Sequence, residues 1–556
     1  MKRIYPIIIL GFILALAIVL RFWQLGSVPI SPDWDEAALG YNAYSILKTG
    51  KDEYGSFLPL SFRSFNDYKP PLYVYLTVPS VAVFGLSVWS VRLPSALFGV
   101  LAVLGTFLLV QTFIRNAKES SEGNVVIGLS ADVVGALPFV AALLLAISPW
   151  HIQFSRVAFE ANIALTLVIW ASYYFFLGFY SKSGFPISAI LFALSLYTYH
   201  SERIFVPCLV ILLFIIYRSR LFIQKKREVA LAILIGVIIL LPLVPVFLNN
   251  SALSRFAGSS VFQKQTELLS GNVMKLAYDK ANGDKIGTLL DNRRIEYTKI
   301  IIRNYLSHFN PNWLFVTGDL QRHHAPGMGL LYLWELPFIL IGIYRLARGK
   351  GPVKSFIFGW FLLAPIAAAP TVPSPHAVRS LVLLPMLQVF TAIGLLATFS
   401  SIRTRYPFWK TPYIIGMSAV ILGMFVYYTH MYFVHMNTEY SEYWQFGYKE
   451  VVTLTESIKS KYDRIVVSSG LEESYIFFLF YTKYDPVKYL AGGGTESQRV
   501  NGEKSRFDKY VFRPILWSSE VRNTSEVYVG TAAEIEKPTI ALVKNLDGTG
   551  AIAISE

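Results

Sequence analysis

Apolar runs of 18 or more residues constrain this 556-residue chain more than any other feature of its sequence. A bilayer core of about 30 Å is crossed by a helix of about 20 apolar residues. The composition agrees, because 54% of the residues are hydrophobic and 15% are charged, whereas soluble domains have about 25% charged residues. The sequence therefore predicts an α-helical polytopic membrane protein.

The hydrophobic pattern predicts about eleven transmembrane helices within residues 1–430. They are expected at residues 4–22, 91–114, 133–147, 157–179, 185–197, 204–217, 229–247, 328–344, 356–369, 377–398 and 413–428. The stretch 33–48 predicts a short amphipathic helix at the membrane interface, and the apolar stretch 70–84 either lies in the interface or forms the start of the second transmembrane helix. Between the expected spans, the segments 26–90 and 249–327 are long enough to form sizeable loops.

Basic residues gather in the short segments between the apolar runs, for example at Arg218–Glu228 and Arg345–Lys354. By the positive-inside rule these segments are cytoplasmic, which places both long loops and the C-terminus outside the cell membrane. The same distribution explains the net charge of +14 as a topology signal, so no nucleic-acid partner is expected.

Residues 431–556 differ in character from the rest of the chain and predict an extracytoplasmic α/β domain. Helices are expected at 450–462 and 472–484, and strands at 464–467, 525–529 and 539–543. The run Gly492-Gly493-Gly494 predicts a loop, because no helix start with Lys-Ser/Thr follows it.

The first long loop is acidic and aromatic. Between residues 29 and 75 it carries six carboxylates, namely Asp33, Asp35, Glu36, Asp52, Glu53 and Asp67. Such a loop predicts chemistry at the membrane surface. An alternative for the first three acids is that they stabilise the start of a helix through its dipole.

Further polar residues are expected at the same outer face: His151, Arg156, Glu160, His200, Arg203, Arg322, His323, His324, His376 and Arg379. Several have plain alternatives. Arg203 and Arg379 could reach lipid headgroups, and Arg156 with Glu160 could form an ion pair along a helix. The pair His323-His324 could bind a metal, but no Cys/His/Asp spacing supports a site, so a loop is favoured.

Three motifs resemble those of the GT-C glycosyltransferases. They are Asp35-Glu36 after the first helix, Lys69-Pro70-Pro71-Leu72-Tyr73 at the end of the loop, and Ser155-Arg156-Val157-Ala158-Phe159-Glu160, where relatives often have Asp instead of Glu. The stretch Ser87–Leu97 is similar to the entry of the family's second helix. Within the superfamily, the sequence resembles the branch of protein O-mannosyltransferases and lipid A aminoarabinose transferases.

The resemblance implies roles for individual residues. Asp35 would be the catalytic base, with Glu36 as its neighbour, and Glu160 would orient the acceptor or a cation while Arg156 pairs with it. A phosphate leaving group needs cations, which makes Lys69, Arg156, Arg203 and Arg379 candidates for donor binding, together with Tyr68 beside Lys69. No residue is assigned to a metal, although two neighbouring acids could hold a divalent cation.

These features predict an inverting membrane glycosyltransferase. Its donor would be a polyprenyl-phosphate sugar, its acceptor a hydroxyl of a lipid, glycan or protein, and membrane lipids would surround it. A transporter or flippase of lipid-linked sugars is the alternative, although the sequence has no visible repeat and no broken helix at mid-membrane. A third hypothesis is a receptor or assembly protein whose outer domain binds a partner, but this hypothesis does not explain the acidic loop.

Overall fold

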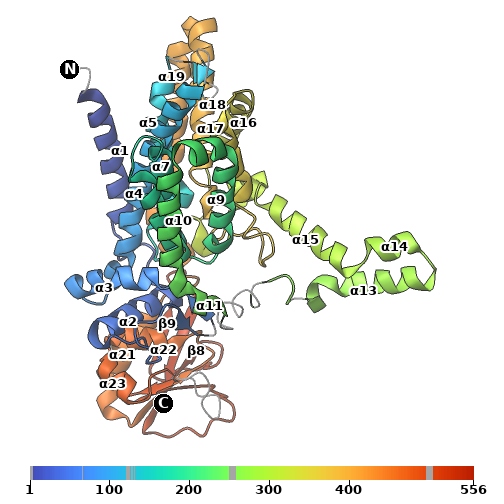
Figure 1. Ribbon diagram of the computed structural model, residues 1–556. Helices are drawn as coiled ribbons and strands as arrows, with labels where there is room; N and C mark the ends of the chain where they lie inside the picture. Colours follow the sequence, from blue (N-terminus) through green and yellow to red (C-terminus); the bar gives the residue numbers. More distant parts are fainter. Residues whose placement is uncertain are drawn as a thin grey trace. The chain divides into compact units, whose positions relative to one another are not determined.

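The computed structural model describes residues 4–65, 67–120, 125–126, 129–130, 132–248, 258, 260–263, 265–495 and 505–556 (Figure 1). The chain forms two compact units. The helical unit comprises Met1–Leu20, Phe98–Phe154 and Phe159–Val426. The loop–sheet unit comprises Arg21–Leu97, Ser155–Ala158 and Tyr427–Glu556.

A helix is present at each of the eleven positions where a span was expected. The helices are α1 (Ile4–Phe22), α4 (Val88–Ser120), α5 (Leu137–Ile147), α7 (Glu160–Leu177), α8 (Gly184–Leu196), α9 (Glu202–Ser219), α10 (Lys226–Leu240), α16 (Glu335–Ala347), α17 (Pro352–Leu363), α18 (Met386–Arg405) and α19 (Lys410–His430).

Not all of these helices are long enough to cross a membrane. Seven described helices have the required length and apolar character, or eight if α5 and α6 (Pro149–Ser155), which meet at a bend of 60°, form one span. The predicted count of about eleven is not confirmed, because α8 and α17 have only 13 and 12 residues. The polytopic helical character of the chain is confirmed.

Close helix pairs organise the helical unit. Helix α8 packs against α7 and α10, and α18 packs against α16 and α5. Gly342 and Gly394 lie where α16 meets α18, and a Cβ on either residue would overlap a backbone carbonyl of the other helix. Small residues allow such close approach between membrane helices.

In the described part of the segment before α16, no helix has the length and apolar character of a membrane span, as expected. This part holds α13 (Gln265–Ala281), α14 (Lys285–Leu290) and α15 (Arg293–Ser307). A short π-helical turn, Trp313–Thr317, ends at Gly318, whose φ of +69° favours glycine. This reversal leads the chain into the turn Gln321–His323.

The loop–sheet unit is built on a six-stranded sheet with the order β6-β7-β5-β8-β10-β9. Strand β5 (Arg464–Ser468) is central and parallel to β7 (Tyr510–Arg513) and β8 (Glu526–Thr531). Strands β6 (Ser505–Phe507), β9 (Ala541–Lys544) and β10 (Gly550–Ser555) complete it with antiparallel pairs. With α21 (Tyr448–Ile458), α22 (Ser474–Thr482) and α23 (Pro486–Ala491), the sheet confirms the C-terminal α/β region.

The acidic loop belongs to this second unit. It forms α2 (Trp34–Thr49), a pairing of β1 (Phe62–Ser64) with β2 (Asp67–Lys69), and α3 (Leu72–Phe84). Helix α2 packs against α3, α22 and α23. At Gly40 a Cβ would lie 2.8 Å from the ring of Phe480, so this contact requires glycine. The acidic loop and the C-terminal sheet thus belong to one compact unit.

Candidate active site

Asp35 and Lys69 form an ion pair in the loop–sheet unit. The Nζ atom of Lys69 lies 2.6 Å from Oδ1 of Asp35. Asp35 is in the first turn of α2, and Lys69 is the last residue of β2. The Asp35 side chain is 44% exposed whereas that of Lys69 is 6% exposed. The pair thus presents a carboxylate to solvent and holds a buried cation behind it.

Asp33 has the helix-start role that the sequence left open. It is the N-cap of α2, and its Oδ1 accepts a hydrogen bond of 2.8 Å from the backbone N–H of Glu36. A capping carboxylate satisfies an N–H that has no partner inside the helix. This bond fixes where α2 begins, and so it fixes where Asp35 and Glu36 lie on the helix.

Glu36 is buried and its carboxylate is fully engaged. Arg92 donates two parallel hydrogen bonds to it, from Nε at 2.9 Å and from Nη2 at 2.8 Å, and the backbone N–H of Ala158 donates a third at 2.9 Å. The remaining guanidinium hydrogens of Arg92 go to the carbonyls of Leu25, Pro29 and Ser31. These contacts indicate that Glu36 anchors α2. Glu36 thus differs from the neighbouring Asp35, whose carboxylate is exposed.

Arg156 and Tyr68 also lie in the loop–sheet unit. The Arg156 guanidinium is buried, donates to the carbonyl of Val28 at 3.0 Å and to the hydroxyl of Tyr432 at 3.2 Å, and lies 4.8 Å from the ring centre of Phe433. These contacts are typical of a structural cation. Tyr68 is half-buried on β2, one residue from Lys69.

Glu53 ties the acidic loop to the C-terminal region. Its carboxylate accepts hydrogen bonds from the Asn42 side-chain amide at 2.9 Å and from the Thr495 hydroxyl at 2.8 Å. The backbone N–H of Thr495 adds a bond of 3.0 Å to the Glu53 carbonyl. Burial raises the pKa of Glu53 to about 7, although these two side-chain bonds oppose the shift.

The other predicted site residues lie in the helical unit. Glu160 is buried in the first turn of α7. Arg203 donates to the Leu196 carbonyl at 3.3 Å and bonds His200 Nδ1 at 3.0 Å. Arg379 donates to the hydroxyl of Thr371 at 2.7 Å. Arg203 and Arg379 therefore both form hydrogen bonds with other groups of the protein.

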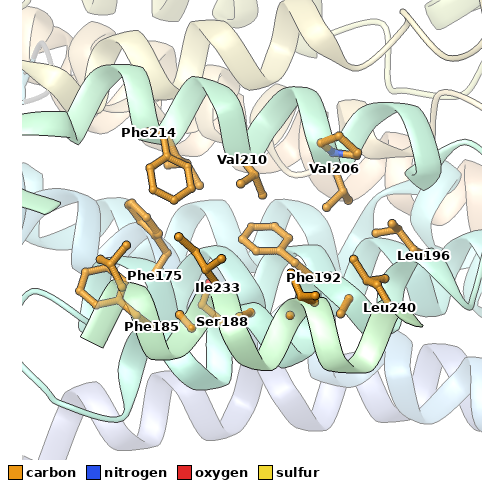
Figure 2. A pocket seen from close by; sticks show the side chains of 18 of the residues that line it. Phe175, Phe185, Ser188, Phe192, Leu196, Val206, Val210, Phe214, Ile233 and Leu240 are labelled. Carbon is orange, nitrogen blue, oxygen red and sulfur yellow. The ribbon is translucent and has the colours of Figure 1, made fainter. Parts of the chain in front are cut away.

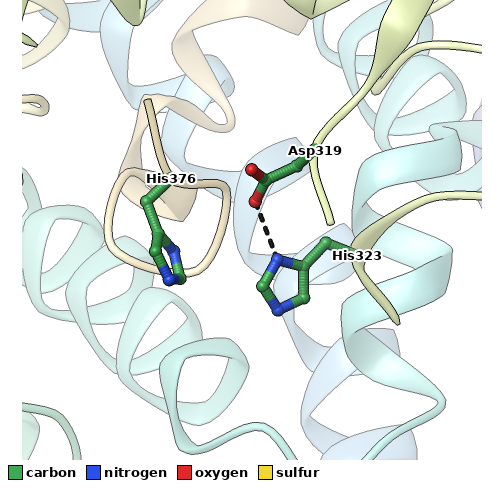
Figure 3. Close-up of side chains that lie close together, drawn as sticks. All are labelled: Asp319, His323 and His376. Atoms are coloured by element: carbon green, nitrogen blue, oxygen red, sulfur yellow. Dashed lines mark hydrogen bonds and ion pairs between the residues drawn. The ribbon is translucent and has the colours of Figure 1, made fainter. Parts of the chain in front are cut away.

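An Asp–His cluster, formed by Asp319, His323 and His376, is a feature that the sequence did not predict (Figure 3). His323 Nδ1 lies 2.7 Å from Oδ2 of Asp319. The same oxygen accepts a 2.8 Å bond from the backbone N–H of Ala377. His324 lies outside the cluster, with its Nδ1 2.8 Å from the carbonyl of Ala325.

The protonation states of the cluster follow from its burial and charge. Burial alone would raise the pKa of Asp319, but its hydrogen bond with His323, its electrostatic interactions with the two histidines and the hydrogen bond from the backbone N–H of Ala377 lower it to about 2. Burial, assisted by the nearby Arg379 charge, holds the pKa of His376 well below its usual range. At neutral pH the cluster therefore contains an ionised carboxylate and a neutral His376 imidazole.

An apolar cavity of about 330 Å³ lies between α7, α8, α9 and α10 (Figure 2). Side chains such as Phe192, Val210 and Ile233 line it, and among the described residues of its lining only Ser188 has a polar side chain. The Ser188 hydroxyl donates to the carbonyl of Ala171, so it offers no donor to a ligand. The cavity suits hydrocarbon and has no group that could catalyse a reaction.

Solved structures with a similar fold place the chain in a structural class. ArnT from Cupriavidus metallidurans, a lipid A aminoarabinose transferase, matches 98% of this chain over 97% of its own length, with a TM-score of 0.54 and 10% identity in the apo state. Its complex with undecaprenyl phosphate matches with the same coverage and TM-score and 11% identity.

The oligosaccharyltransferase AglB from Archaeoglobus fulgidus, solved with an inhibitory peptide and a dolichol-phosphate, also matches. It covers 86% of this chain at 12% identity and a TM-score of 0.51, and the chain spans 64% of its length. No protein-family model and no curated protein matches the sequence.

The chain has the GT-C glycosyltransferase fold, which confirms the resemblance seen in the sequence motifs. Within that class its similarity extends over nearly the full length of ArnT.

Proposed function

We propose that the protein is a membrane glycosyltransferase that transfers a sugar from a polyprenyl-phosphate donor to an acceptor hydroxyl on the outer membrane face. The observation that carries the proposal is the ion pair between the exposed Asp35 and the buried Lys69. A displacement at a sugar phosphate needs a base for the acceptor proton and a cation for the leaving phosphate, and this pair supplies one of each.

In the proposed reaction the acceptor oxygen attacks the anomeric carbon while the bond from that carbon to the phosphate oxygen breaks. Asp35 takes the acceptor proton, and polyprenyl phosphate leaves with the bonding electrons. One displacement inverts the anomeric carbon. An ammonium group has three N–H donors, so Lys69 can bind a phosphate oxygen while it still contacts Asp35. Its burial strengthens that interaction, because low-dielectric surroundings screen charge less than water does.

Other residues would support this centre. Glu36 holds α2 through Arg92 and is a positioning residue in the proposal, and the buried Arg156 has the same kind of role. Glu160 would orient the acceptor or a cation, and Tyr68, Arg203 and Arg379 would help to bind the donor.

Two further observations support a lipid-linked donor. The apolar cavity could hold part of an isoprenoid chain, since ligand cavities of about 300–1,000 Å³ are typical. Structures with this fold were solved with undecaprenyl phosphate and with a dolichol-phosphate. Acceptors of lipid, glycan and protein type are all compatible with the proposal.

The test uses purified protein in liposomes with labelled polyprenyl-phosphate sugars. The wild type should release free polyprenyl phosphate and transfer the label to an acceptor. Asp35→Asn keeps the side-chain shape and should lower turnover by roughly 10²–10⁴, the usual size of a general-base contribution. Asp67→Asn, on the same loop, is the matched control and should retain turnover.

The same preparation separates the proposal from the transporter alternative. A transporter would move the labelled lipid across the bilayer and leave its sugar attached. Lipid movement without any release of polyprenyl phosphate, over the full set of donors and acceptors, would refute the transferase proposal.

A further inference from the structure

The Asp–His cluster brings metal-ligating side chains from two separate loops of the helical unit to one place (Figure 3). Asp319 and His323 lie four residues apart around the turn Gln321–His323, and His376 lies between α17 and α18. One ligand atom from each residue lies within 4.8 Å of the other two. We propose that these three residues bind one divalent transition-metal ion, with Zn²⁺ as the best-fitting ion.

The geometry is close to what such an ion requires. With bonds of about 2.0–2.2 Å, tetrahedral zinc holds its ligand atoms roughly 3.3–3.5 Å apart. Side-chain rotations that move the ligand atoms by about 1 Å would bring all three within bonding distance of a single ion. Binding requires the tautomer of His323 in which the ligating nitrogen carries no proton, so the single N–H proton of the neutral imidazole lies on the other ring nitrogen.

His376 is held in place by a neighbouring histidine. Its backbone N–H donates to His308 Nε2 at 3.2 Å, and His308 Nδ1 bonds the carbonyl of Asn304 at 2.7 Å. Both nitrogens of His308 are therefore engaged, so His308 is support and not a ligand. The Nδ1 atom of His376 itself is buried and has no hydrogen-bond partner among the described residues. A buried polar atom without a partner is costly, and a metal bond would remove that cost.

The surroundings of His323 suit a metal ligand. The rings of Phe154 and Phe159 lie 5.6 and 5.7 Å from its ring centre and limit the access of water to it. The backbone N–H of Ala377 donates to Oδ2 of Asp319, which is the type of outer contact that orients metal ligands.

The charges and donor types select the class of ion. Arg379, whose charge acts on His376, opposes a cation, and the carboxylate of Asp319 offsets it. Two imidazoles and one carboxylate suit Zn²⁺ and similar transition metals, whereas Mg²⁺ and Ca²⁺ prefer oxygen ligands. Three protein ligands leave at least one coordination position for water or another oxygen ligand.

The inference is independent of the proposed transferase activity, so its test measures metal binding alone. The full chain, purified in detergent and stripped of metal, is titrated with Zn²⁺ against a chromophoric chelator. We expect one tight site that Mg²⁺ and Ca²⁺ do not fill. Asp319→Asn and His376→Gln should each lower the Zn²⁺ affinity of this site by at least about 10–100-fold. Mutation of residues that only orient metal ligands already causes a loss of this size.

Two histidine variants are matched controls. His324→Gln changes the neighbour of His323 that lies outside the cluster. His435→Gln removes one member of an exposed pair in the loop–sheet unit, in which the Nε2 atoms of His430 and His435 are 3.1 Å apart. Both variants should keep the tight site.

Binding of Co²⁺ to the wild-type chain gives a second test. It uses no variant, so its result does not depend on whether a variant folds. We expect the intense visible bands of a four- or five-coordinate Co²⁺ site. The proposal is overturned if the wild-type chain shows no such bands and no tight Zn²⁺ site. It is also overturned if Asp319→Asn and His376→Gln bind Zn²⁺ like the wild type, or if inorganic phosphate stabilises the chain through this cluster and Zn²⁺ does not.

Discussion

Replacing Glu36 with Gln should destabilise the loop–sheet unit without acting on the chemical step. The substitution keeps the side-chain shape but removes the negative charge that faces Arg92. Both residues are almost fully buried, with exposures of 2% and 0%. The amide nitrogen of Gln would also meet a donor, either on Arg92 or at the backbone N–H of Ala158.

The expected cost follows from the isolated charge. Removing one partner of a buried ion pair typically costs about 3–5 kcal/mol, because the other charge stays buried without compensation. For a unit of 150–250 residues, 1 kcal/mol corresponds to about 2–4 °C in Tm. We therefore expect Tm to fall by roughly 6–20 °C, measured by the thermal unfolding of the purified chain in detergent.

The double variant with Arg92→Gln provides the decisive comparison. It removes both charges together, so it should cost less than the sum of the two single changes. Glu450→Gln, an exposed acid of the same unit, should leave Tm nearly unchanged. If Glu36→Gln kept the wild-type Tm and abolished turnover, Glu36 would act in the chemistry and the anchoring role would be wrong.

The other predictions test the cation, a buried acid and the membrane orientation. Lys69→Ala should weaken donor use more than folding, and Lys69→Arg should rescue it only in part because a compact point charge is needed; unchanged donor affinity and turnover in Lys69→Ala would exclude the role. The pKa of Glu53 rises from about 4.5 to about 7 on folding. Between these pH values the folded chain holds a proton that the unfolded chain has lost, so stability should fall by up to about 3 kcal/mol as pH rises through this window. Glu53→Gln should abolish this fall in thermal unfolding at pH 5 and pH 8, and an unchanged pH profile would contradict it. In a cysteine-free background, a cysteine at the exposed Ser518 should react with an impermeant thiol reagent in intact cells and one at the exposed Ser219 should not; the reverse pattern would invert the topology.

Local features of the fold could be predicted because their causes are local in sequence. Long apolar runs predicted the helices, and the short helix after Asp33 was predicted from a helix-start pattern that the structure confirms as an N-cap. The number of spans was less predictable. An apolar helix of 12 or 13 residues, such as α8 or α17, gives almost the same hydrophobic signal as a full span.

Partners distant in sequence could not be predicted, since no local pattern encodes them. Nothing in the local sequence around Arg92 indicates its partner, yet it neutralises Glu36 across 56 positions. The contact between Glu53 and Thr495 spans 442 positions. In the Asp–His cluster, the spacing of Asp319 and His323 is the only local signal, and the third member, His376, is 53 positions further along the chain than His323.

The position of Asp35 depends on the C-terminal region as well as on the acidic loop. The N-terminal end of α2 is held by Asp33 and by a 2.9 Å bond from the Trp34 backbone N–H to Gln445. Further along α2, Tyr41 donates to the carbonyl of Tyr484 at 3.1 Å. A carboxylate that must meet a hydroxyl within hydrogen-bond reach tolerates little displacement. The sheet region therefore belongs to the scaffold that orients the proposed base, which gives residues 431–556 a role in the chemistry even if none of their side chains touches the substrate.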